Sequence, residues 1–384
     1  MFINNDVKYI GVNDRQIDLF EGQYPVPEGI SYNSYVIVDK KIAIMDSVDA
    51  NFTDVWLENI KSTLKQASPD YLIIQHMEPD HSASAYEFLK EYPKTTIVAS
   101  TQAFKMLENF FDGEITNERI VVKDGDILEL GKHTLRFLTA PMVHWPEVIM
   151  TYDQTDRILF SADAFGKFGD LDSNEQWIDE ARRYYFGIVG KYGMQVQTVL
   201  KKLSDTQIDY ICPLHGPTLS QNLGYYLDLY DKWSKYQPEN NGVMVAYTSI
   251  YGNTEKAVNL LVDALKENGC ETVTVTDLAR CDISKAVSDA FIYGKLVLAT
   301  TTYNGHIFPA MNTFIHALLE RQYQNRTIAI VENGSWAPVA AKVIKKMFES
   351  SKNITFTDTV VTINSSVKSN NLKQIEDVAK EVLK

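Results

Sequence analysis

The spacing of apolar and polar residues divides the chain into two halves with different patterns. In the first half, short runs rich in β-branched residues predict strands, and helical patterns lie between some of them. The predicted strands are 34–39, 41–46, 71–75, 95–100, 119–124, 134–140, 148–152 and 157–163, the first two forming a hairpin. The predicted helices are 52–67, 83–91, 102–110 and most of 175–205. This mixture favours a layered α/β domain built on two sheets.

The second half has a stricter pattern, in which strands and helices alternate. The predicted pairs are 243–248 with 254–267, 271–276 with 282–290, 295–300 with 310–321, 327–332 with 337–350, and 354–361 with 370–383. Such an alternation is typical of a doubly wound sheet of five parallel strands. A polar segment at 235–242, which contains Pro238 and Gly242, separates the halves. We therefore expect one domain over 1–240 and another over 241–384.

Length and charge narrow the range of functions. A chain of 384 residues is longer than one domain with a single hydrophobic core usually is. Its 37 basic and 50 acidic residues give a net charge of −13, which disfavours nucleic acid and anionic membrane surfaces as partners. No apolar run is long enough to span a membrane, and the N-terminus lacks the features of a signal peptide, so we expect a cytoplasmic protein. The three cysteines have no short spacing that would indicate a disulfide framework or a cysteine metal site.

The sequence HMEPDH at 76–81 follows the apolar strand 71–75 and concentrates metal-binding side chains. It contains His76, Glu78, Asp80 and His81 within six residues. A loop that leaves a buried strand holds its side chains rigidly, as a metal site requires. Three further candidates end strand-like segments elsewhere: His144, Asp163 and His215. These seven side chains are enough for two metals if Asp163 bridges them, whereas His133 and His316 are interpreted as polar core residues.

The order of these donors resembles that of the metallo-β-lactamase superfamily, which implies an αββα sandwich for residues 1–240. In that superfamily a His-rich cluster is followed by a distant His, a bridging Asp and a last His. Its zinc hydrolases usually carry His where this chain has Glu78. A carboxylate there makes the site harder and more anionic, which favours iron over zinc.

The second domain carries three polar loops at the carboxyl ends of its predicted strands, where a doubly wound sheet binds its ligand. The first opens a helix and offers hydroxyls and backbone N–H groups to an anion. It has no P-loop lysine, and the chain has no GxGxxG, so a phosphate monoester such as FMN fits best. The candidate FMN-binding residues are Thr248, Ser249, Ile250, Tyr251, Gly252, Asn253 and Thr254, then Thr302, Tyr303, Asn304, Gly305 and His306, and finally Asn333, Gly334, Ser335 and Trp336. This half resembles flavodoxin over nearly its whole length.

The two halves together resemble the flavodiiron proteins (A-type flavoproteins), and the resemblance covers essentially the entire chain. It implies two irons bridged by Asp163 and one FMN. It also implies reduction of dioxygen to water or of nitric oxide to nitrous oxide. His76, Glu78 and His144 would hold one iron, and Asp80, His81 and His215 the other. No catalytic residue is assigned beyond these ligands.

The resemblance also implies partners. Electrons would come from a separate donor, a rubredoxin-like protein or a reduced deazaflavin, because the chain has no CxxC pair. A head-to-tail homodimer, or a dimer of such dimers, would bring the FMN of one subunit near the irons of the other. Two alternatives stay open: a zinc or mixed-metal hydrolase that carries a flavodoxin-like domain, and a non-catalytic electron carrier whose metal site is structural.

Overall fold

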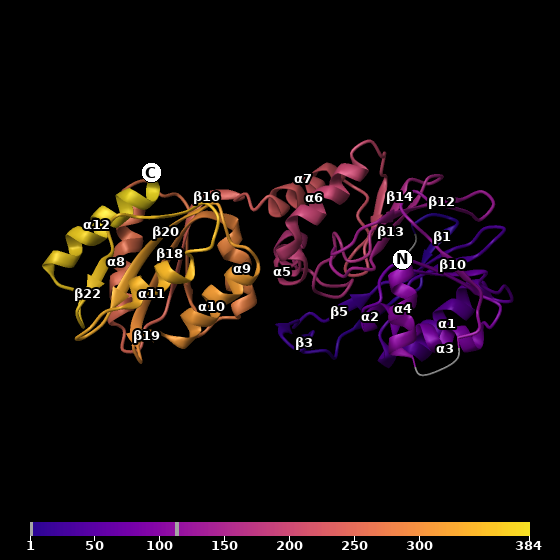
Figure 1. Ribbon diagram of the computed structural model, residues 1–384, viewed down its shortest axis with the longest axis horizontal. Coiled ribbons are helices and arrows are strands. Elements are labelled where there is room, and N and C mark those ends of the chain that lie inside the picture. Colours follow the sequence, from indigo (N-terminus) through magenta and orange to yellow (C-terminus); the bar gives the residue numbers. More distant parts are fainter. Residues whose placement is uncertain (1–2, 112–114) are drawn as a thin grey trace. The chain divides into compact units, whose positions relative to one another are not determined.

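The computed structural model describes residues 3–111 and 115–384, and the chain forms two compact units (Figure 1). The first is Met1–Asp231 and the second Lys232–Lys384. The division falls within helix α7 (Leu223–Ser234), earlier in the chain than the polar segment at 235–242. Trp233, near the end of α7, is buried and donates a hydrogen bond from Nε1 to Glu239 Oε1 over 2.7 Å. The end of α7 is thereby tied to the segment that leads into the second unit.

Two sheets form the centre of the first unit. The six-stranded sheet has the order β1 (Val7–Tyr9), β6 (Tyr35–Ile37), β7 (Ala43–Met45), β8 (Tyr71–Ile74), β9 (Thr96–Ala99) and β10 (Arg119–Val121). The five-stranded sheet has the order β11 (Ile127–Glu129), β12 (Thr134–Thr139), β13 (Ile149–Asp153), β14 (Ile158–Phe160) and β15 (Tyr210–Cys212). Two short pairs precede them, β2 (Val12–Asp14) with β5 (Ile30–Tyr32) and β3 (Leu19–Phe20) with β4 (Tyr24–Pro25). The predicted hairpin is the antiparallel pair β6–β7.

Helices complete the first unit. They are α1 (Thr53–Leu64), α2 (Pro79–Ser82), α3 (Ala85–Glu91), α4 (Thr101–Phe110), α5 (Trp177–Tyr184) and α6 (Gly193–Leu203). A 3-10 turn, η1 (Ala50–Phe52), precedes α1, while a π-helical turn, η2 (Tyr185–Val189), and a 3-10 turn, η3 (Gly190–Tyr192), join α5 to α6. The stretch 175–205 is therefore mostly helical, as predicted, but interrupted.

The alternation of side chains along β7 shows how the layers are held together. Ile44 points into a core that contains Trp56 of α1 and Leu107 of α4. Its neighbour Met45 points the other way, into a core shared with Phe137 of the second sheet. Successive residues of a strand face opposite sides of a sheet, so β7 is apolar on both faces and lies between helices and the second sheet.

The second unit is a parallel sheet with helices on both faces. The strand order is β17 (Val273–Asp277), β16 (Asn240–Tyr247), β18 (Tyr293–Tyr303), β20 (Arg326–Asn333) and β21 (Ile354–Phe356). The helices are α8 (Asn253–Glu267), α9 (Ile283–Ile292), α10 (Pro309–Glu320), α11 (Ala340–Met347) and α12 (Ser369–Leu383). Figure 1 shows the sheet between α8 and α12 on one side and α9 and α10 on the other. This is the predicted doubly wound, flavodoxin-like arrangement.

Two details of this sheet differ from the prediction. The fifth strand is split into β21 and β22 (Val361–Ile363), which both pair with β20. Between them, Thr359 donates from its backbone N–H and its hydroxyl to the carboxylate of Glu381, which takes this residue out of the ladder. A two-residue strand, β19 (His306–Ile307), folds back antiparallel on β18.

Candidate functional site

All seven metal-donor candidates of the first unit lie just beyond strand ends. His76 follows β8, His144 lies between β12 and β13, Asp163 follows β14, and His215 follows β15. The HMEPDH segment is not a loop throughout, because Asp80 and His81 lie in the short helix α2. Pro79 begins this helix, a position at which proline is tolerated because its missing N–H has no helical partner.

The donor atoms gather into two groups on either side of Asp163. The first donor group is His76, Glu78 and His144, and the second donor group is Asp80, His81 and His215. Asp163 Oδ2 lies 2.9 Å from His144 Nε2 and 3.3 Å from His76 Nε2. Asp163 Oδ1 lies 3.3 Å from His81 Nε2 and 3.9 Å from His215 Nε2. One carboxylate therefore presents one oxygen to each group.

Contacts within each group are equally close. In the first donor group, Glu78 Oε2 lies 3.0 Å from His144 Nε2 and 3.3 Å from His76 Nε2. In the second donor group, Asp80 Oδ2 lies 3.3 Å from both His81 Nε2 and His215 Nε2, whose two nitrogens are 3.0 Å apart. Five of these six side chains are buried and Glu78 is nearly so, which keeps bulk water from the space between them.

The carboxylate oxygens at the centre lack hydrogen bonds. Among the described residues, neither oxygen of Asp163 or of Asp80 accepts one in regular geometry, although both residues are buried and imidazole nitrogens lie nearby. A buried, ionised carboxylate without partners is strongly destabilising unless a cation faces it. The donor set therefore fits two metal ions, with Asp163 between them.

The charges in this cluster reinforce one another. Burial alone would lower the pKa of His144, but the carboxylates of Asp163 and Glu78 outweigh it and raise that pKa to about 9. Burial opposes ionisation of Asp163, yet the histidines, His76 first, hold the pKa of Asp163 well below its usual value. The carboxylates thus stay ionised at neutral pH and attract positive charge to the space that they face.

Several residues that support the donors were not singled out by the sequence. Ser31 accepts a bond from His215 Nδ1 at its backbone oxygen (2.7 Å) and from the Gly216 N–H at its hydroxyl (2.7 Å). Asp46, fully buried, accepts from the backbone N–H of His76 over 3.2 Å. For both residues, the sequence shows only a polar side chain within an apolar strand segment. Because their partners are distant in the sequence, it does not indicate what they contact.

Two more buried residues lie beside the donors. Glu147 Oε1 is 2.7 Å from His76 Nδ1. The ring of Tyr184 is 5.4 Å from that of His215, and its hydroxyl has no hydrogen-bond partner in the part of the chain that the structure describes. Burial, together with the carboxylates of the cluster, raises the pKa of Tyr184 well above its usual value. The sequence around Tyr184 offers no signal that distinguishes it from an ordinary core tyrosine.

The remaining histidines have other environments. His133 is buried, and its two ring nitrogens lie 2.8 Å from Asp153 and 3.3 Å from Asp6, in agreement with its interpretation as a polar core residue. Asp6, His133 and Asp156 also bring ligand atoms together, but the Lys132 ammonium, 2.6 Å from Asp6, already supplies a positive charge there. The interpretation of His316 as a core residue is wrong, since it is exposed on α10.

The second unit contains a cavity of about 760 Å³ at the carboxyl ends of β16, β18 and β20, within the range of small-molecule sites. The predicted residues that line it are Ser249, Ile250, Tyr251, Asn253, Thr254, Thr302, Tyr303, Asn304, Gly305, Asn333, Gly334, Ser335 and Trp336. Thr248, Gly252 and His306 are not in its wall: Thr248 is buried against Thr300, and His306 is exposed. The other lining residues were not among the candidates: Thr301, Phe308, Ala337 and Val339 belong to the same predicted loops, and Ser365 lies outside them.

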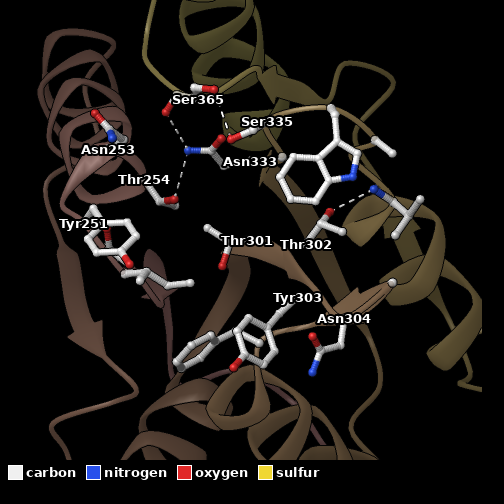
Figure 2. Close-up of a pocket in the computed structure, with 18 residues that line it drawn as sticks. Tyr251, Asn253, Thr254, Thr301, Thr302, Tyr303, Asn304, Asn333, Ser335 and Ser365 are labelled. Carbon is white, nitrogen blue, oxygen red and sulfur yellow. Dashed lines mark hydrogen bonds between the residues drawn. The ribbon is translucent and has the colours of Figure 1, made fainter.

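Hydrogen bonds tie the loops of this cavity together, as Figure 2 shows. Asn333 Nδ2 donates to Thr254 Oγ1 (3.4 Å) and to the Ser365 carbonyl (3.2 Å). The Val339 N–H donates to Thr302 Oγ1 over 2.9 Å. The third loop is therefore held from both sides, and α11 begins only at Ala340 rather than at 337.

The cavity has one polar end and one aromatic side. Helix α8 points its N-terminus at the cavity; its N-cap Gly252 has no side chain to cap that end, and the Ser249 hydroxyl accepts the Glu255 N–H over 3.3 Å. The dipole of the helix and the remaining N–H groups of its first turn favour an anion. Tyr251 and Trp336 line the cavity and are 90% and 91% exposed. This combination fits a phosphate monoester joined to a flat ring system, as in FMN.

The fold and the two sites define a two-domain protein in which a metallo-β-lactamase-like metal unit is joined to a flavodoxin-like unit. A family model described as ODP family beta lactamase matches residues 30–216. A nitric oxide reductase of Moorella thermoacetica is 28% identical over 91% of this chain and 90% of its own. The flavodiiron protein of Giardia intestinalis is 25% identical, with a TM-score of 0.89 over 99% of this chain and 95% of its own.

A further solved structure has the same fold. The rubredoxin oxygen:oxidoreductase of Desulfovibrio gigas superposes with a TM-score of 0.92 over 100% of this chain and 97% of its own, at 24% identity. Over nearly its whole length the chain is therefore similar in sequence and structure to flavodiiron proteins. In residues 3–111 and 115–384, no helix combines the length and apolar character needed to cross a membrane.

Proposed function

We propose that this chain is an oxidoreductase that reduces dioxygen to water, nitric oxide to nitrous oxide, or both, at a pair of irons in its first unit. FMN in the second unit relays electrons from an external donor. The observation that carries the proposal is Asp163, whose two unpartnered oxygens face two separate donor groups. The name of the Moorella relative, a nitric oxide reductase, supports the reaction class.

In this proposal the first donor group holds one iron and the second donor group the other, with Asp163 shared. Three of the seven donors are carboxylates, Glu78, Asp80 and Asp163, and hard oxygen donors favour iron over zinc. The 760 Å³ cavity would hold FMN, with the N-terminus of α8 available to its phosphate and Tyr251 and Trp336 available to its ring.

When bound, the irons supply a redox-active site for a diatomic gas, and FMN supplies one-electron transfer. The protein's own part is to hold and enclose them. The buried donors keep bulk water away, and the ring of Trp145, with its centroid 5.3 Å from that of His76, covers the first donor group. The unpartnered Tyr184 hydroxyl stands in the field of the carboxylates and is placed to hold a proton beside the second donor group.

The proposal includes a separate rubredoxin-like protein or a reduced deazaflavin as the donor, and a head-to-tail homodimer. The exposed rings of Tyr251 and Trp336 support an assembly, because a second chain would cover apolar surface that the cavity rim leaves open. A cytoplasmic location is also proposed, and the three free cysteines agree with a reducing compartment.

Analysis of anaerobically purified protein tests the proposal. We expect two irons and one FMN per chain, and consumption of dioxygen or nitric oxide when reduced rubredoxin is added. Rates with each gas on one preparation then give the preference. Two zincs per chain with no turnover of either gas would instead support a hydrolase, and bound FMN without gas reduction would support a plain electron carrier.

A further inference from the structure

Glu147 lies outside the donor set, yet its side chain is completely buried behind His76. It follows His144, Trp145 and Pro146 and stands just before β13. Its Oε1 is 2.7 Å from His76 Nδ1 and also accepts the Met77 N–H over 2.8 Å. Its Oε2 has no hydrogen-bond partner within residues 3–111 and 115–384. A buried carboxylate is costly to desolvate, and here one of its hydrogen bonds goes to the ring of His76 and the other to the backbone of the next residue, Met77.

The position of Glu147 determines how His76 can act. A carboxylate accepts hydrogen bonds, so the proton of His76 is on Nδ1 and the lone pair is on Nε2, the atom that faces Asp163. An anion behind an imidazole also raises the basicity of its other nitrogen. Glu147 therefore both orients His76 and makes it a stronger metal donor.

The second donor group has no equivalent support. His215 Nδ1 faces the neutral carbonyl of Ser31 over 2.7 Å, and His81 Nδ1 has no hydrogen-bond partner among the described residues. The buried carboxylate of Asp46 interacts electrostatically with His81, but it accepts its hydrogen bonds from Gln75 and from the His76 backbone. Among the described residues, Glu147 therefore gives the first donor group a carboxylate hydrogen-bonded to a donor ring, which the second donor group lacks. The two metal positions are unequal in this respect.

We propose that Glu147 is a positioning residue that makes the first donor group the tighter of the two metal sites. This inference rests on the proposed function, because it needs two metals in the places assigned above. Glu147 touches neither metal nor substrate, and acts only through His76. Its extra negative charge also favours the ferric over the ferrous state of the iron in the first donor group.

Replacing Glu147 with Gln removes the negative charge of the side chain but keeps its size and shape. The amide oxygen accepts the same two hydrogen bonds that Oε1 accepts, but the negative charge is lost. Asp153→Asn is a matched control, because Asp153 is also fully buried and lies 2.8 Å from the Nδ1 of a histidine, His133, outside both donor groups. Any general effect of neutralising a buried carboxylate beside histidine will appear in both variants.

The test is a titration of the full-length, FMN-loaded and iron-free protein with Co²⁺ against a competing chelator, followed by the visible absorption of the bound cobalt. We expect two equivalents in the unmodified protein. In Glu147→Gln one equivalent binds roughly 10- to 100-fold more weakly, the usual effect of losing such a partner, and the other is unchanged. Glu78→Gln, which removes a donor from the first group alone, should weaken the same equivalent. Asp153→Asn should leave both unchanged.

Equal weakening of both equivalents, or of neither, in Glu147→Gln would overturn the inference while leaving the metal centre intact. Failure of the unmodified protein to bind two equivalents would overturn the proposed function and this inference with it. If Glu147→Gln does not fold, ¹⁵N-histidine NMR of the zinc-loaded protein decides instead. A His76 proton on Nδ1 that exchanges more slowly than that of His81 supports the inference, and equal exchange of the two contradicts it.

Discussion

The loop that opens α8 gives a sharp test of how the flavin site is built. Gly252 is the N-cap of α8 and has φ +81°, in the left-handed region that suits glycine. At the other end of the helix, Gly269 has φ +88°. A Cβ at Gly252 would meet only the flexible carboxylate of Glu255 at 3.9 Å, and a Cβ at Gly269 would meet nothing within 4 Å. Alanine therefore introduces backbone strain at either position without a clash.

The expected magnitude follows from that strain. A side chain in the left-handed region costs about 1–2 kcal/mol, so Gly252→Ala and Gly269→Ala should lower the melting temperature by similar amounts. Only the loop at Gly252 adjoins the cavity, through Tyr251 and Asn253. In Gly252→Ala the loop is expected to relax without FMN and to return to its strained conformation when FMN binds. The strain energy of 1–2 kcal/mol then weakens FMN binding by roughly 5- to 30-fold.

Quenching of FMN fluorescence on titration into flavin-free protein measures this affinity. The prediction is weaker FMN binding in Gly252→Ala and unchanged binding in Gly269→Ala, at a similar loss of thermal stability. Equal FMN affinities in the two variants would show that the backbone of this loop is not organised for the ligand, and would refute the assignment of the phosphate to the N-terminus of α8.

Three further changes test other parts of the molecule. Asp163→Asn should lose metal from both donor groups but keep FMN. Metal analysis and the flavin absorption spectrum check this, and retention of both metals would show that Asp163 is not the bridge. Tyr184→Phe should leave the melting temperature unchanged or raise it, because a buried hydroxyl without a partner destabilises the fold, and a drop of several degrees would show that the hydroxyl has a stabilising partner. Burial opposes the protonation of His133, but Asp153 outweighs it and raises the pKa of His133. The contribution of the His133–Asp153 pair to the free energy of unfolding is thus fully present below the pKa of histidine in the unfolded chain, about 6.5. It is lost as the pH rises through the higher pKa of His133 in the folded protein. Asp153→Asn should accordingly lower the melting temperature more at pH 6 than at pH 9, and a difference independent of pH would contradict the assignment.

The sequence indicated candidate donors that the fold brings together, because most of them follow an apolar strand segment. His76, Asp163 and His215 are far apart in the chain, but the strands before them belong to sheets whose ends meet, so the pattern of strand followed by donor carried the information. The cavity loops were predicted for the same reason, since the carboxyl ends of β16, β18 and β20 lie at one edge of a parallel sheet.

What the sequence did not indicate depends on contacts between distant segments. Glu147 and Ser31 support donors that lie 71 and 184 positions away. Ser365 reaches the cavity because the fifth strand is interrupted, and that interruption depends on Glu381 of α12. Conversely, Thr248 has the right composition for a ligand-binding loop, but its side chain is still inside the sheet.

The central claim is that this fold holds two irons, one at each donor group, with Asp163 between them. Anomalous X-ray diffraction at the iron absorption edge, on crystals of anaerobically prepared protein, tests it most directly. The account predicts two iron peaks per chain, one beside His76, Glu78 and His144 and the other beside Asp80, His81 and His215. A single peak, or iron at another cluster such as Asp6, His133 and Asp156, would contradict it.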